Sequence, residues 1–179
     1  MIKRLVIFTL LPLMITLSCD QGLPPEDVYD NPLDEDEVGY ETPALTFYPL
    51  ENDVTLGSSF TVGVYVLGVE DLGGSHVSMT YDQTRLSILS VSVGDLFADT
   101  DQAPIFIAEQ DDGSLEIHTS FLGNDSTSVS GTGSLANVVF TSITSGTSGL
   151  TYGSDCEFVS ANDESIEIKG FGEGVVNAQ

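Results

Sequence analysis

The chain has 179 residues, of which 28 are acidic and 4 are Lys or Arg, giving a formal net charge of −24 at pH 7. A surface this acidic repels phosphate backbones, so we expect no nucleic-acid partner. With only two cysteines and 41% hydrophobic residues, the protein must be stabilised by a hydrophobic core and not by a disulfide framework.

The N-terminal segment has the pattern of an export signal. Lys3 and Arg4 precede an apolar run over residues 5–17, which is too short to span a bilayer as a mature helix. Cys19 follows almost at once and resembles the cysteine of the bacterial lipoprotein box, whose thiol is acylated. The resemblance implies a lipoprotein signal peptide over residues 1–19 with lipidation at Cys19. The protein would then be lipid-anchored to a bacterial membrane in the cell envelope, facing the periplasm or the cell exterior. An ordinary secretory signal with an incidental cysteine is the alternative.

Residues 20–43 form the next segment, which contains nine acidic residues, four prolines and no Lys or Arg. It has too little apolar surface to offset the entropy of ordering the chain. The sequence therefore predicts an acidic disordered linker here, followed by one folded domain over residues 44–179.

The domain is predicted to consist of strands alone. Residues 60–67 alternate, with Val62, Val64 and Val66 on one side, which is typical of a half-buried strand. Gly73 and Gly74 are expected to reverse the chain into a second strand over residues 76–81. Further strands are expected over residues 44–48, 86–93, 104–109, 114–122, 134–143, 150–159, 165–169 and 174–177, with a tight hairpin at residues 111–114. This spacing indicates an all-β fold, a β-sandwich of jelly-roll type.

These elements carry a resemblance to the cohesin domain, the receptor module of cellulosome scaffolds. The similar features are a Val-rich strand, a strand that ends in Tyr81-Asp82, and a following Leu86-Ser87-Ile88. They continue through residues 94–97 and 133–140 to Gly-Glu-Gly-Val-Val at 172–176. The resemblance covers nearly all of the chain after about residue 44 and implies a cohesin-like sandwich that binds a dockerin-like protein.

The resemblance also implies where a partner would bind. The strand before Tyr81-Asp82 and the strand over residues 114–122 would lie side by side and expose one polar face. Its members would be His76, Ser78, Thr80, Glu116, His118, Ser120 and Leu122. Gly74 and His76 stand where type I cohesins carry Asn and Asp, so the resemblance does not extend to recognition of a type I dockerin.

The residues give no reason to expect catalysis. No serine lies in a strand-to-helix elbow, and adjacent acids such as Asp111 and Asp112 would point apart in a turn. Two histidines with only Glu116 nearby are a thin ligand set, so no metal site is predicted there. No cofactor is expected, although calcium stays open as an alternative to solvated acids in the loops. The loop carboxylates concerned are those of Asp99, Asp101, Asp125 and Asp163.

Three functions remain. The first is a membrane-anchored module that displays a protein partner, a dockerin-bearing polysaccharide-degrading enzyme. The second is a carbohydrate-binding module that would bind a polysaccharide through exposed aromatic rings, for which Tyr65 and Tyr152 are the candidates. The third is a structural envelope lipoprotein. The chain contains no Trp, which favours the protein partner over a sugar.

Overall fold

The computed structural model describes residues 39–122 and 127–179. The predicted signal peptide, Cys19 and most of the predicted linker lie outside these residues. Within them the structure has twelve strands and one short 3-10 turn, which confirms the all-β fold. No helix in the described part of the chain is long and apolar enough to cross a membrane. The elements are β1 (Ala44–Tyr48), β2 (Glu51–Val54), β3 (Ser59–Tyr81), β4 (Leu86–Val93), η1 (Asp95–Phe97), β5 (Ile105–Asp111), β6 (Ser114–Ser120), β7 (Val129–Ser142), β8 (Gly146–Tyr152), β9 (Glu157–Ser160), β10 (Ser165–Ile166), β11 (Gly170–Phe171) and β12 (Gly174–Ala178).

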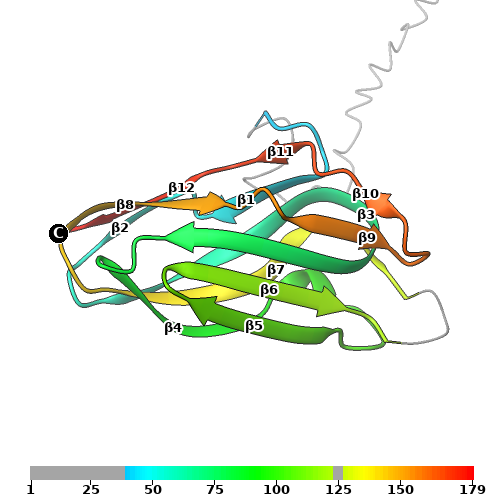
Figure 1. Ribbon diagram of the computed structural model, residues 1–179, viewed down its shortest axis with the longest axis horizontal. Coiled ribbons are helices and arrows are strands. Elements are labelled where there is room, and N and C mark those ends of the chain that lie inside the picture. Colours follow the sequence, from blue (N-terminus) through cyan, green and yellow to red (C-terminus); the bar gives the residue numbers. More distant parts are fainter. Residues whose placement is uncertain (1–38, 123–126) are drawn as a thin grey trace, which may run out of the picture. The chain divides into compact units, whose positions relative to one another are not determined.

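The 23-residue strand β3 belongs to both layers of the sandwich. Its N-terminal half pairs with β1 and β7, and β4 and β11 complete that layer. Its C-terminal half lies between β6 on one side and β8 and β9 on the other, in the layer that also holds β5, β12 and β2 (Figure 1). The pairing register with β7 shifts between Val66 and Leu72, where Gly68 and Asp71 have positive φ. Such bulges bend a strand, which lets β3 cross from one layer to the other.

The core lies between the two layers and is filled by the alternating side chains that the sequence predicted. Val62, Val64 and Val66 from the first half of β3 are at most 1% exposed. Rings from opposite layers meet there: Phe47 of β1 stacks on Tyr152 of β8 with centroids 4.3 Å apart. Across the rest of the core, Tyr81 contacts the edge of Phe140 at 5.5 Å.

One buried polar pair, Ser75 and Thr119, lies in the apolar core on the inner side of β3 and β6. The Ser75 and Thr119 hydroxyls are hydrogen bonded to each other at 2.7 Å, from directly paired positions of β3 and β6. Both residues are less than a tenth exposed. Because each hydroxyl satisfies the other, the pair fixes the register of the two strands without leaving an unpaired polar atom.

The predicted chain reversal at Gly73 and Gly74 is wrong, because β3 continues straight through both residues. They are small for a different reason, which is the close approach of neighbouring backbone. A Cβ at Gly73 would lie 2.7 Å from the Ser160 carbonyl oxygen, and one at Gly74 would lie 3.2 Å from the Thr119 carbonyl oxygen. The glycine pair therefore allows β9 and β6 to flank β3 closely.

The predicted hairpin at residues 111–114 is present, but the predicted strand over residues 150–159 is divided. The hairpin at residues 111–114 is confirmed: Asp112 and Gly113 both have positive φ, as the two central residues of a type I′ turn require. The single strand expected over residues 150–159 is wrong, because β8 ends at Tyr152 and β9 begins at Glu157. The turn between them folds back over β3, as the hydrogen bond from Gly153 N to the Ser78 carbonyl oxygen shows.

Candidate functional site

The outer face of the second layer carries the predicted partner-binding residues. β3 and β6 pair so that Gly74, His76, Ser78 and Thr80 lie opposite Ser120, His118, Glu116 and Ser114. The neighbours Val77, Met79, Leu115 and Ile117 point inward and are at most 1% exposed. The structure thus brings the predicted set onto one face, with Leu122 just beyond the end of β6. We call this surface the β3–β6 face.

Two histidines occupy the centre of the β3–β6 face. His76 and His118 are directly paired across the two strands. Their rings are stacked, with centroids 4.5 Å apart and planes 3° from parallel. The resemblance to cohesins implied that both residues lie on one face, without establishing that they are directly opposed.

Glu116 joins this pair to the neighbouring residues. Its Oε2 lies 2.8 Å from His76 Nε2, and its Oε1 accepts a hydrogen bond from the Ser78 hydroxyl at 2.9 Å. Both oxygens of the carboxylate are therefore held. Ser78 is only 7% exposed, so it orients Glu116 and offers little surface of its own.

Asp155 lies at the same place, brought there by the turn between β8 and β9, and was not among the predicted residues. One of its carboxylate oxygens lies with His76 and Glu116 in a group whose donor atoms are all within 4.8 Å of one another. Gly153 allows this, because a Cβ there would lie 2.5 Å from Asp155 Oδ1 and 2.9 Å from Ser78 Oγ. No local pattern could have indicated the contact, since residue 155 is far from 76 and 116 in the chain.

The next residue, Cys156, is half-buried, and its Sγ lies 3.4 Å from the Ser78 carbonyl oxygen. Burial raises the pKa of the Cys156 thiol, and the carboxylates of Asp155 and Glu116 raise it further. This thiol is therefore held in its protonated, poorly nucleophilic form.

Apolar and acidic side chains surround the histidine pair. On β5, Ile105 pairs with Ser120 and Ile107 pairs with His118, and the two isoleucines are 41% and 48% exposed. On the other side, Glu157 of β9 pairs with His76. Strands β3, β5, β6, β8 and β9 contain no Lys or Arg, so the face is acidic with an apolar flank.

The remaining predicted residues of the β3–β6 face are exposed at its edges. Thr80 shares a hydrogen bond with Thr151 of β8 at 2.8 Å. Ser120 and Leu122 are exposed, Leu122 by 60%. Leu122 adds to the apolar flank formed by Ile105 and Ile107.

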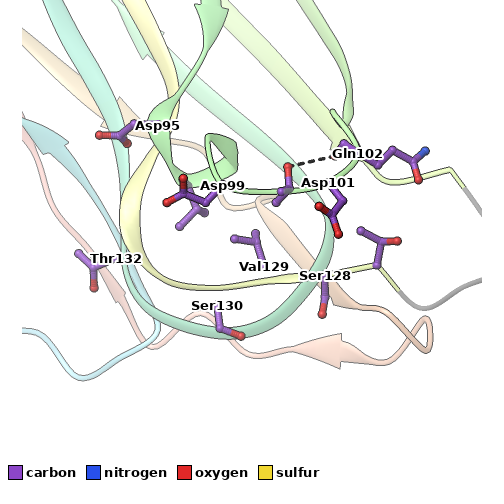
Figure 2. Close-up of a pocket in the computed structure, with 11 residues that line it drawn as sticks. Asp95, Asp99, Asp101, Gln102, Ser128, Val129, Ser130 and Thr132 are labelled. Atoms are coloured by element: carbon purple, nitrogen blue, oxygen red, sulfur yellow. Dashed lines mark hydrogen bonds between the residues drawn. The ribbon is translucent and has the colours of Figure 1, made fainter.

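A surface pocket elsewhere holds part of the loop set considered for calcium. Asp99 and Asp101 line it together with Asp95, beside the start of β7 (Figure 2). Asp95 Oδ1 is already bonded to the backbone N–H and the hydroxyl of Ser134, both at 2.6 Å. Within residues 39–122 and 127–179, no cluster of three acidic, His or Cys donor atoms includes Asp99 or Asp101. Asp125 lies outside the described residues.

The two aromatic candidates for sugar stacking do not form an exposed platform. Tyr152 is packed against Phe47, its hydroxyl donates a hydrogen bond to the Thr46 carbonyl oxygen at 2.5 Å, and burial raises its pKa well above the ordinary value. Tyr65 is partly buried and packs against Tyr48 with centroids 5.7 Å apart. The geometry therefore does not favour the carbohydrate-binding alternative.

The family is shown by a model of the cohesin domain, which matches residues 50–176. This chain belongs to the cohesin domain family. Cohesin domains are binding modules without catalytic activity, which confirms that the protein is not an enzyme. No curated protein sequence matches the chain.

Solved cohesin structures share the fold. A non-cellulosomal cohesin from the archaeon Archaeoglobus fulgidus is 18% identical, with a TM-score of 0.64 over 76% of this chain and 90% of its own. A type II cohesin from Acetivibrio cellulolyticus is 16% identical, with a TM-score of 0.67, and the match covers 76% of this chain and 96% of that cohesin. The sixth cohesin of scaffoldin B from the same organism was solved in complex with a Cel5 dockerin. It is 20% identical, with a TM-score of 0.63, and the match covers 76% of this chain and 98% of that cohesin. At these identities the comparison establishes the cohesin-like sandwich.

Proposed function

We propose that this protein is a cohesin module that binds a dockerin-like partner through the β3–β6 face and is held on a bacterial membrane by a lipid at Cys19. The observation that carries the proposal is the His76–His118 stack on the outer face of the layer, where His118 is exposed, His76 is partly exposed and an apolar flank lies beside them. A rigid ring pair beside exposed isoleucines offers contact area at low entropic cost. Dockerin complexes of other cohesins support the class of partner.

The charges on the face define the chemistry of the partner. Glu109, Glu116 and Glu157 all belong to this face, and no cation on its strands balances them. A complementary partner presents Lys or Arg opposite these acids and an apolar side chain against Ile105 and Ile107. Like-charged partners are rejected, because juxtaposed carboxylates repel.

The experiment is a binding titration of the purified protein against a panel of dockerin modules, with Ile107→Arg as the test variant. Leu89→Arg is the matched control, because Leu89 is an exposed apolar residue, 68% accessible, on β4 of the other layer. Ile107→Arg should abolish binding, whereas Leu89→Arg should leave it unchanged. The reverse pattern would place the binding surface on the other layer and refute the proposal.

The anchor has a separate test. Cys19→Ala removes the thiol that would be acylated, so the variant should lose radiolabelled fatty acid and accumulate as unprocessed precursor. Cys156→Ala is the control and should be labelled and processed as the native protein is. Continued labelling of the Cys19→Ala variant would show that the protein is not a lipoprotein.

A further inference from the structure

Three side chains from three separate elements place potential metal ligands together on the β3–β6 face. They are His76 of β3, Glu116 of β6 and Asp155 of the turn between β8 and β9. One ring nitrogen and one oxygen from each carboxylate all lie within 4.8 Å of one another. In the part of the chain that the structure describes, this is the one group of its kind.

We propose that these three residues form a binding site for a divalent transition-metal ion of the zinc class. Zinc binds His nitrogen and carboxylate oxygen at about 2.0–2.2 Å, which places tetrahedral ligand atoms about 3.4 Å apart. The observed separations bracket this value, from 2.8 Å between His76 Nε2 and Glu116 Oε2 to at most 4.8 Å within the group. Closing the site around an ion requires side-chain rotations that shorten the widest of these separations by up to about 1.4 Å.

The ligand types select the metal. An imidazole nitrogen favours zinc and its neighbours in the transition series, whereas calcium and magnesium prefer sites made of oxygen alone. The isolated loop acids elsewhere on this chain lack such a nitrogen. The group is also accessible, since the His76 and Glu116 side chains are 29% and 32% exposed.

The hydrogen bond between His76 and Glu116 marks the place that the ion would occupy. His76 Nε2 lies 2.8 Å from Glu116 Oε2, and because a carboxylate only accepts, the ring Nε2–H is the donor of this bond. On binding, the ring carries its proton on Nδ1 instead, so that the Nε2 lone pair and the carboxylate both face the cation. No proton or electron has to be supplied from outside.

Neighbouring contacts already orient two of the ligands. The Ser78 hydroxyl holds Glu116 Oε1 at 2.9 Å, which leaves Oε2 for the ion. The stacked ring of His118 fixes the plane of the His76 imidazole. Such outer contacts typically change metal affinity by about 10- to 100-fold when they are removed. Three protein ligands would leave a fourth coordination position of the ion open to water.

The test is a calorimetric titration of the whole protein with Zn²⁺ in the presence of excess Ca²⁺, which occupies non-specific carboxylate sites. We expect one tight Zn²⁺ site, and the variants His76→Ala, Glu116→Gln and Asp155→Asn should each weaken it by more than the about 10- to 100-fold that the loss of an outer contact costs. Ser78→Ala should weaken it by about tenfold. Circular dichroism establishes that each variant is folded. If His76→Ala does not fold, the isosteric variants Glu116→Gln and Asp155→Asn still test the site.

Two controls separate this site from others. Glu157→Gln removes an acid that is paired with His76 but is not in the group, and Cys156→Ser removes the nearby thiol. Both should bind Zn²⁺ as the native protein does. Three results would overturn the proposal. Zn²⁺ binding could persist in all three ligand variants, Ca²⁺ could displace the bound Zn²⁺, or the Cys156→Ser variant could lose Zn²⁺ binding. No dockerin is present in this experiment, so its outcome does not depend on the proposed partner.

Discussion

The imidazole rings of His76 and His118 lie stacked on adjacent strands, with 4.5 Å between their centroids and 3° between their planes. Glu116 is hydrogen bonded to His76 beside the stack, and the buried Ser75–Thr119 hydrogen bond joins the same two strands on their inner side. The stack forms a preorganised surface, because neither ring needs to be ordered when a partner binds.

Removing the exposed His118 ring tests whether the stack takes part in partner binding. His118→Ala should weaken binding of a dockerin partner by about tenfold, equivalent to about 1.4 kcal/mol, while unfolding changes little because His118 is exposed. Surface plasmon resonance measures the affinity. Ser87→Ala, an exposed position on β4 of the other layer, is the control. Equal affinity of the His118 variant and the native protein would exclude the stack from the binding surface.

The buried Ser75–Thr119 pair should behave as a coupled unit. Thr119→Val leaves the Ser75 hydroxyl buried without its partner and should lower the free energy of unfolding by about 1–3 kcal/mol. The double variant Ser75→Ala, Thr119→Val should recover much of that loss, since no polar atom is then left unpaired. Urea denaturation measures both.

The exposed pair Ser59–Thr141, bonded at 2.9 Å, is the matched control for that experiment. Thr141→Val should cost less than about 0.5 kcal/mol, because water replaces the lost bond. Equal losses at the buried and exposed positions would show that burial does not determine the cost.

Gly73 is the second position where stability should respond sharply. Gly73→Ala places a Cβ 2.7 Å from a backbone oxygen that cannot move without separating β9 from β3, so we expect a loss of about 1–3 kcal/mol. Gly149→Ala, in β8 with no atom within 4 Å of the added carbon, should be neutral. Thermal unfolding compares the two, and similar midpoints would contradict the close-approach explanation.

Asp82, which follows the end of β3, should make stability depend on pH. The Thr84 hydroxyl and backbone N–H bond to its carboxylate at 2.6 and 2.9 Å, and together with the Arg85 guanidinium at 3.2 Å they lower its pKa. A lowered folded-state pKa contributes stability above the unfolded value of about 3.9, and the contribution is lost as pH falls through the folded value.

Asp82→Asn should therefore destabilise the protein near neutral pH, and the difference from the native protein should shrink as the pH falls below about 4. Denaturant titrations over this pH range measure it, with Asp101→Asn as a control for the loss of one surface charge. A difference that is constant with pH would show that the Asp82 carboxylate contributes nothing through its ionisation.

Much of this fold could be predicted from the sequence because the side chains of a strand alternate with a period of two. The alternation at residues 60–66 and 77–81 correctly identified the core-facing positions, although Gly63 and Ser78 on the other side are buried as well. The Asp112-Gly113 turn could be predicted because its backbone requires particular residues. These are local properties, which neighbouring residues determine by themselves.

The tertiary structure decided which residues of different strands contact one another. It made Gly73 and Gly74 part of one long strand and not a turn, because β9 and β6 approach the backbone there. It also placed Ile107 beside His118 and Asp155 beside Glu116. Sequence determined which side of each strand is polar, but the partners of a strand are set by long-range pairing and core packing. No local pattern encodes those contacts, so the neighbours of the predicted face, Ile107 and Asp155, became visible only in three dimensions.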